Sequence, residues 1–205
     1  MREYYTIENE ETSELIEKKS KFIANICNVT TIEEAEKKLE KLRKKYYDAR
    51  HNCYAYRVLD KESVIDRSSD DGEPSGTAGA PMLNILKKEN LCNILVVVTR
   101  YFGGILLGTG GLVRAYSQST QDVIEKSDII LKHEGYVARL EVEYKDLEKL
   151  RYFCKKREIN IIEIEYLENV IVKIEFKKEE KGIFKNKENL NFDYLNYKII
   201  QEKFI

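Results

Sequence analysis

The sequence predicts an α+β protein of two domains, residues 1–132 and 133–205. Its 205 residues suffice for one domain or for two small ones. Eight of the ten glycines lie between Gly72 and Gly111, so tight turns concentrate in the first part. The tail shows the order β-α-β-β-α-β, which is typical of a ferredoxin-like domain.

Hydrophobic periodicity predicts the elements of the first domain in turn. Residues 21–29 alternate as a strand, and Thr31 with Glu34 forms a capping box for a helix over 32–47. The other expected elements are a hairpin of 52–59 and 62–67, a helix through Leu83 and Leu86 with Ser75 or Thr77 as its cap and Pro81 near its start, a buried strand over 93–99 and a helix over 110–126.

The second domain is predicted from its alternating pattern in the same way. The expected elements are a strand over 136–144, a helix over 146–157, strands over 159–166 and 170–178, a helix over 179–190 and a strand over 195–203. Gly182 and Asn186 weaken the helix over 179–190.

Composition excludes several classes of function. The net charge of -1 rules out nucleic-acid binding through bulk positive charge, so only a local patch could contact RNA. The sequence has no signal peptide and no apolar run long enough to span a membrane, which predicts a cytoplasmic protein. Four isolated cysteines and two histidines offer no ligand set, so we expect no metal and no cofactor. No oligomeric state is predicted.

One segment with unusual chemistry is 70–79, where three carboxylates precede a helix start. Free N–H groups at that start would attract an anion such as phosphate. The carboxylates could instead hold Mg²⁺, act as acid and base, or cap the helix. The residues concerned are Asp70, Asp71 and Glu73 as acids and Ser75, Gly76 and Thr77 as N–H donors. The sequence leaves a binding role and a structural role open.

A second glycine-rich segment, 99–114, follows a buried strand and enters a helix, where phosphate loops occur. It lacks the phosphate-loop signature because Thr109 stands where a lysine is required. Its N–H groups could still cradle an anion, with Arg100 or Arg114 as a fork. Alternatively, the glycines allow close packing and Arg100 pairs with Asp70 or Asp71. The candidate anion-binding residues here are Arg100, Tyr101, Phe102, Gly103, Gly104, Gly110, Gly111 and Arg114, joined by Lys21.

His51 and Cys53 form a third candidate. They lie two residues apart on a predicted strand, on the same side and about 7 Å from each other, which does not suit a catalytic Cys–His pair. We therefore interpret His51 as a hydrogen-bonding residue that lines the anion site. Among the aromatic residues, Tyr101 and Phe102 flank the glycine turn and could stack on bases.

Four segments of the sequence resemble the YigZ/IMPACT family. These segments are 19–24 (KSKFIA), 51–56 (HNCYAY), 70–79 (DDGEPSGTAG) and 96–104 (VVVTRYFGG), continued by Gly108, Gly110, Gly111 and Arg114. The resemblance covers about residues 15–125. It implies that the first domain has the α/β fold of a small-subunit ribosomal protein and of domain IV of elongation factor G, and that the tail is a small ferredoxin-like domain.

The resemblance also implies a role in translation, because eukaryotic IMPACT proteins are translation regulators with a protein partner. Our leading hypothesis is a non-enzymatic cytoplasmic binding protein that contacts RNA or the ribosome through the glycine-rich face. One alternative is an enzyme that acts on a small phosphorylated substrate with Asp70, Asp71 or Glu73 as base. Another is a protein-interaction module without a ligand. The near-zero net charge argues against tight, non-specific RNA binding and favours either of these two alternatives.

Overall fold

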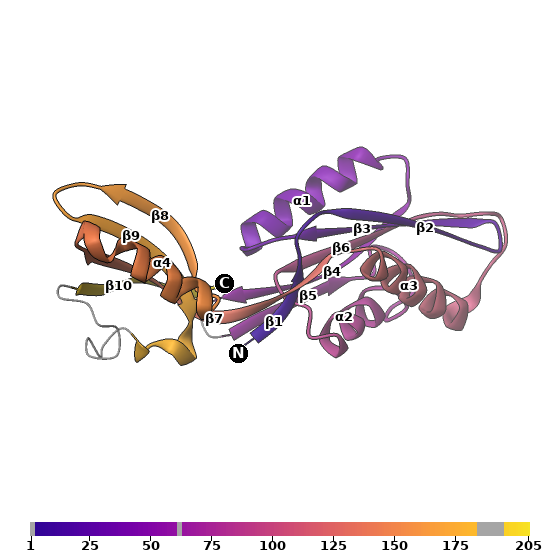
Figure 1. The fold of residues 1–205 in the computed structure, drawn as a ribbon. Helices are drawn as coiled ribbons and strands as arrows, with labels where there is room; N and C mark the ends of the chain where they lie inside the picture. Colours follow the sequence, from indigo (N-terminus) through magenta and orange to yellow (C-terminus); the bar gives the residue numbers. More distant parts are fainter. Residues whose placement is uncertain (1–2, 61–62, 184–194) are drawn as a thin grey trace. The chain divides into compact units, whose positions relative to one another are not determined.

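The computed structural model describes residues 3–60, 63–183 and 195–205. It divides into two compact units, Glu3–Leu131 and Lys132–Ile205. Both units combine helices with antiparallel sheets, so the predicted α+β class is confirmed (Figure 1). No helix in the described ranges is long and apolar enough to cross a membrane.

The first unit is a five-stranded antiparallel sheet with helices on both faces. Its elements are β1 (Glu3–Ile7), β2 (Glu11–Glu17), β3 (Ser20–Asn28), α1 (Ile32–Lys45), β4 (His51–Asp60), β5 (Ser63–Ser69), α2 (Gly79–Lys88), β6 (Ile94–Tyr101) and α3 (Gly108–Glu125). The strand order is β2-β3-β6-β4-β5. Helix α1 covers one face and helices α2 and α3 cover the other (Figure 1).

Alternation along the strands supplies a core on each face. Phe22 and Ala24 on β3 belong to the core under α2 and α3, whereas Cys27 belongs to the core under α1. Strand β6 is central and buried over most of its length, as its apolar run predicts. The predicted cap of α1 is confirmed, because the Thr31 hydroxyl accepts a hydrogen bond from the Glu34 N–H.

Two strands at the start of the chain were not among the predicted elements. Strand β2 pairs with β3 and forms one edge of the first sheet. Strand β1 exchanges hydrogen bonds with the segment after α2, where the Tyr5 N–H bonds the Asn90 carbonyl and the Cys92 N–H bonds the Tyr5 carbonyl. In addition, α3 begins at Gly108, two residues before the predicted start.

The second unit has the strand order of a ferredoxin-like domain. Its elements are β7 (Ile129–Val142), a 3₁₀ turn (Tyr144–Asp146), α4 (Leu147–Lys156), β8 (Asn160–Tyr166), β9 (Val170–Lys177), a 3₁₀ turn (Lys178–Glu180) and β10 (Leu195–Phe204). The sheet runs β10-β7-β9-β8, with every pair antiparallel. Most of the predicted helix over 179–190 lies outside the described residues.

Candidate functional site

The side chain of Asp70 caps the N-terminus of α2. Its carboxylate accepts hydrogen bonds from the N–H groups of Gly76 (2.8 Å), Ala78 (2.9 Å) and Gly79 (2.8 Å). Burial raises the pKa of Asp70, but these three bonds outweigh burial and hold the pKa below its usual value. Of the donors expected to attract an external anion, the Gly76 N–H is therefore bonded to the chain's own carboxylate, and the Thr77 N–H is bonded to the Pro74 carbonyl at 3.1 Å.

The predicted caps of α2 are wrong. The helix is capped at Ala78 without a side-chain hydrogen bond, and the Thr77 hydroxyl instead donates to the Pro74 carbonyl at 2.6 Å. Thr77 is buried, while Ser75 and Gly76 are exposed. Asp70 replaces Ser75 and Thr77 because it reaches three N–H groups at once, whereas a local hydroxyl cap reaches only one.

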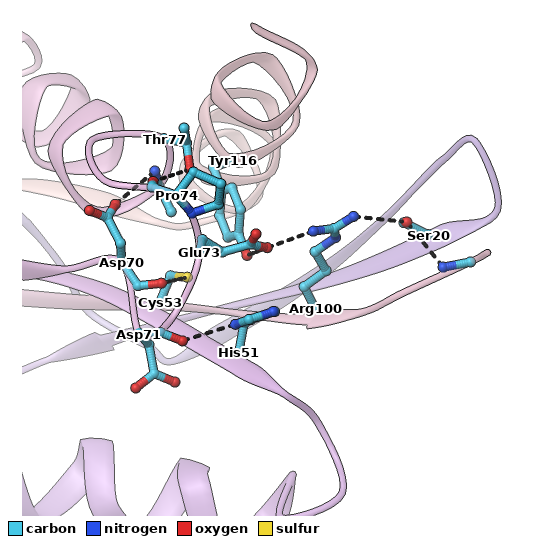
Figure 2. Close-up of polar contacts among 12 residues, drawn as sticks. Ser20, His51, Cys53, Asp70, Asp71, Glu73, Pro74, Thr77, Arg100 and Tyr116 are labelled. Carbon is cyan, nitrogen blue, oxygen red and sulfur yellow. Dashed lines mark hydrogen bonds and ion pairs between the residues drawn. The ribbon is translucent and has the colours of Figure 1, made fainter. Parts of the chain in front are cut away.

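A buried ion pair joins the two glycine-rich segments. Nη1 of Arg100 lies 2.7 Å from Oε1 of Glu73, and both side chains are more than nine-tenths buried. The Tyr116 hydroxyl on α3 donates to the same oxygen at 2.8 Å. Figure 2 shows the three side chains converging above the sheet. Burial, with Cys53 and Glu73 nearby, raises the pKa of Tyr116, so its hydroxyl keeps its proton.

Arg100 differs from both roles that the sequence suggested. If Arg100 were structural, the sequence predicted an ion pair with Asp70 or Asp71. The observed partner is Glu73. Nor does Arg100 point outward to a ligand, because only 6% of the residue is exposed. Its guanidinium lies over the rings of Phe22 (5.5 Å) and Phe102 (5.7 Å), so Arg100 supports the loop that carries Phe102.

His51 and Cys53 hold the 70–73 turn against the first residues of β4. Nδ1 of His51 lies 2.9 Å from the Asp71 carbonyl oxygen, and the Cys53 thiol donates to the Asp70 carbonyl (Figure 2). Burial is the main cause that raises the pKa of Cys53 to about 12, so the thiol is protonated at neutral pH. Gly72 has a φ of +87° and completes the turn. We therefore assign both residues to positioning this turn.

Asp71 is also bonded within the chain. Its carboxylate lies 2.9 Å from Nη2 of Arg43 and accepts the Asn52 N–H at 2.7 Å. The structure thus brings together His51, Asp70, Asp71, Glu73 and Arg100, and each of them forms its polar contacts with other groups of the chain. Within the described residues no group of three metal-ligating side chains is found.

The loop after β6 is pressed against the turn between β2 and β3. A Cβ on Gly103 would lie 2.0 Å from the Lys19 carbonyl carbon, so only glycine fits there. The Gly103 N–H also lies 3.2 Å from the Ser20 hydroxyl. Gly110 and Gly111 lie in the first turn of α3, whose start has no side-chain cap.

Beside these internal contacts lies an exposed surface that sequence reasoning found only in part. Phe102, Ile105 and Leu106 are exposed by 52%, 43% and 82%. In the described part of the chain Lys18, Lys19 and Arg114 form no ion pair, and Lys18 and Arg114 line one cavity of about 450 Å³. We call Lys18, Lys19, Phe102, Ile105, Leu106 and Arg114 the basic–apolar surface. Only Phe102 and Arg114 were predicted.

Two other predicted residues lie elsewhere. Lys21 pairs with Glu14 at 2.7 Å and projects to the α1 face of the sheet, opposite to Arg100. The Tyr101 hydroxyl donates to Asp48 at 2.7 Å, and this bond is the main cause that raises its pKa to about 12. For Lys18 and Lys19 the sequence offers one weak signal, two adjacent lysines at a tight turn, where both have positive φ.

Fold and site together define a two-unit α+β protein. Its acidic segment 70–79 forms contacts within the chain, which we call the clamp, and its loop after β6 carries exposed side chains. Residues 18–124 match the Impact N-terminal domain, and 140–187 match a domain of unknown function, DUF1949. The chain belongs to the IMPACT family.

Individual relatives agree with this assignment. The IMPACT family member YvyE of Bacillus subtilis is 36% identical over 90% of this chain and 84% of its own. YigZ of Escherichia coli is 36% identical over 77% of this chain and 78% of its own. A crystal structure described as a hypothetical protein is 31% identical, covers 99% of this chain and 100% of its own, and has a TM-score of 0.65.

Proposed function

We propose that this chain is a cytoplasmic, non-enzymatic binding protein of translation control that contacts RNA or the ribosome. The family supports the link to translation, because the resemblance to IMPACT proteins implies a regulatory role there. The observation that carries the proposal is the basic–apolar surface, which combines an exposed aromatic ring with cations that form no ion pair in the described ranges.

This arrangement suits single-stranded RNA. Cations neutralise phosphates, and an exposed ring stacks on a base, without any need for an excess of positive charge over the whole chain. The buried ion pair contributes indirectly, since Arg100 packs under the Phe102 ring and holds the loop in place. Arg100 is thus a positioning residue, and Phe102, Lys18, Lys19 and Arg114 would make the contacts.

The rival hypothesis of an enzyme is less well supported. A base for catalysis needs a free carboxylate, but Asp70, Asp71 and Glu73 are each bonded to backbone N–H groups or to an arginine. A docking site for a protein partner in translation control remains the other alternative, because Ile105 and Leu106 are apolar and exposed.

Co-sedimentation with ribosomes and titration with single-stranded RNA test the proposal. Replacing Lys18, Lys19 and Arg114 together by alanine should abolish co-sedimentation and flatten the salt dependence of RNA binding. With three phosphate contacts, the logarithm of the RNA binding constant should fall with the logarithm of salt concentration with a slope of about -2.

A matched control is the alanine variant of Lys37, Lys88 and Lys126, which are exposed and lose the same charge elsewhere in the first unit. Equal loss in both variants would show that only net charge matters. If the wild-type chain binds neither RNA nor ribosomes at low salt, the proposal fails and a protein partner becomes the better hypothesis.

A further inference from the structure

A second cavity lies on the other face of the first sheet, between α1 and the β2–β3 pair. It has a volume of about 480 Å³, and none of its lining residues belongs to the basic–apolar surface. The side chains that matter for its chemistry are Asn25 and Cys27 from β3 and Lys38, Lys41 and Lys45 from α1. The three lysines share one side of the helix because they lie three, four and seven residues apart.

Asn25 contributes a polar group that the fold leaves unsatisfied. The residue is 96% buried, as only 4% of it is exposed. Its side-chain oxygen lies 3.1 Å from the Thr12 hydroxyl, which donates to it. Its amide nitrogen is buried and has no hydrogen-bond partner. A buried donor without a partner lowers stability, so its presence in the lining of a cavity points to a ligand that accepts a hydrogen bond.

The charges around Asn25 favour an anion. Lys38 is already neutralised, since its Nζ lies 2.9 Å from Glu10 and donates to the Asn28 carbonyl at 2.7 Å. Lys41 and Lys45 are exposed and form no ion pair with any residue that the structure describes, although Lys45 lies over the Tyr46 ring. Two positive charges near the cavity therefore lack a counterion.

The other acidic or ionisable lining groups do not cancel these charges. Glu11 lines the cavity, but alternation along β2 turns its side chain to the opposite face from Thr12. Burial is the main cause that raises the pKa of Cys27 to about 11, with Glu10 adding to the rise and Lys38 and Lys41 opposing it. The Cys27 thiol is thus neutral at pH 7.

We propose that this cavity binds a phosphate group, supplied by free phosphate or by a small phosphorylated molecule. The two lysines match the charge of a phosphate dianion, and the Asn25 amide donates to one of its oxygens. A carboxylate carries one charge and would leave one lysine without a counterion. The proposal is independent of RNA contact at the basic–apolar surface, because the two sites share no residue.

Nuclear magnetic resonance of the full chain, titrated with inorganic phosphate, tests this directly. We expect a saturable shift of the Asn25 side-chain amide, with no comparable shift for acetate at equal ionic strength. Lys41→Ala and Lys45→Ala should each weaken phosphate binding roughly tenfold. Lys37→Ala, on the same helix and exposed, should leave it unchanged.

Asn25→Val separates a ligand-binding role from a structural one. Removing an unsatisfied buried donor should leave the melting temperature unchanged or raise it, while phosphate binding is lost. The proposal is overturned by a shift that does not saturate, by equal weakening in Lys37→Ala, or by an Asn25→Val variant that is destabilised and still binds. A response to a short single-stranded RNA without one to inorganic phosphate would also contradict it.

Discussion

The two glycine-rich segments of the first unit look alike in sequence and behave differently in the fold. In 70–79 the charged groups are bonded internally, as the Asp70 cap and the Glu73–Arg100 pair show. In 102–111 the backbone packs closely at Gly103, but Phe102 and Leu106 stay exposed. The segment with the richer chemistry is therefore structural, and the apolar segment offers the free surface.

This difference shows how a buried clamp can serve an exposed loop. Arg100 forms an ion pair with Glu73, and its guanidinium also lies against the Phe102 ring. Because the ion pair is buried, packing fixes the position of the Arg100 guanidinium. The guanidinium in turn fixes the position of Phe102 in the loop. Variants of the clamp should change stability most, and variants of the loop should change binding most.

The largest expected effect is loss of the ion pair. Arg100→Ala leaves the buried Glu73 carboxylate without its counterion, and we expect the free energy of unfolding to fall by about 3–5 kcal/mol. Urea denaturation measures this. Arg114→Ala removes the same charge from an exposed position and should change stability by less than about 0.5 kcal/mol.

A double variant sharpens the test. Arg100→Met with Glu73→Leu removes both charges and should recover part of the lost stability, because no buried charge stays unpaired. If Arg100→Ala instead unfolds like the wild type and only ligand binding suffers, Arg100 contacts the ligand directly and the proposed division between clamp and loop is wrong.

A smaller effect is expected from the Asp70 cap, and it depends on pH. The pKa of Asp70 is lower in the folded chain than its ordinary value of 3.8. The carboxylate therefore adds stability above about pH 4, and this stability is lost as the pH falls through the folded pKa. At pH 7, Asp70→Asn should cost about 1–2 kcal/mol.

The measurement is the difference in unfolding free energy between wild type and Asp70→Asn from pH 7 to pH 3. Taking the difference cancels the other carboxylates, which titrate in both proteins. The difference should shrink toward low pH. A difference that stays constant over this range would mean that the charge of Asp70 plays no part in capping α2.

Local signals explain why much of the fold was predictable. The Thr31 cap and the apolar run of β6 are each set by residues close in sequence. Strand β2 was missed because Glu11, Glu14 and Glu17 recur along it, and such a charged strand is stable only as the edge partner of β3. That pairing is a tertiary effect which no local pattern reveals.

The candidate site was predictable as a set of residues but not as a set of contacts. Asp70, Asp71 and Glu73 lie within four positions, and which of them meets Arg100, at least 27 residues away, depends on the positive-φ turn at Asp71 and Gly72. The lysines of the β2–β3 turn gave too weak a signal, because lysine is common on surfaces.

The smallest effect on stability, and the sharpest test of the loop, comes from Phe102→Ala. The ring is half exposed, so the variant should lose only about 0.5–1 kcal/mol through its contact with Arg100. RNA affinity should fall by about 1–3 kcal/mol if the ring stacks on a base, and the salt slope should not change because no charge is lost. Arg114→Ala should instead reduce the slope by about 0.7.

Tyr47→Ala, which removes an aromatic ring exposed by 85% elsewhere in the first unit, serves as the control in the same titrations. Unchanged affinity in Phe102→Ala, or equal losses in both aromatic variants, would remove base stacking from the proposal and leave the cations alone to account for binding.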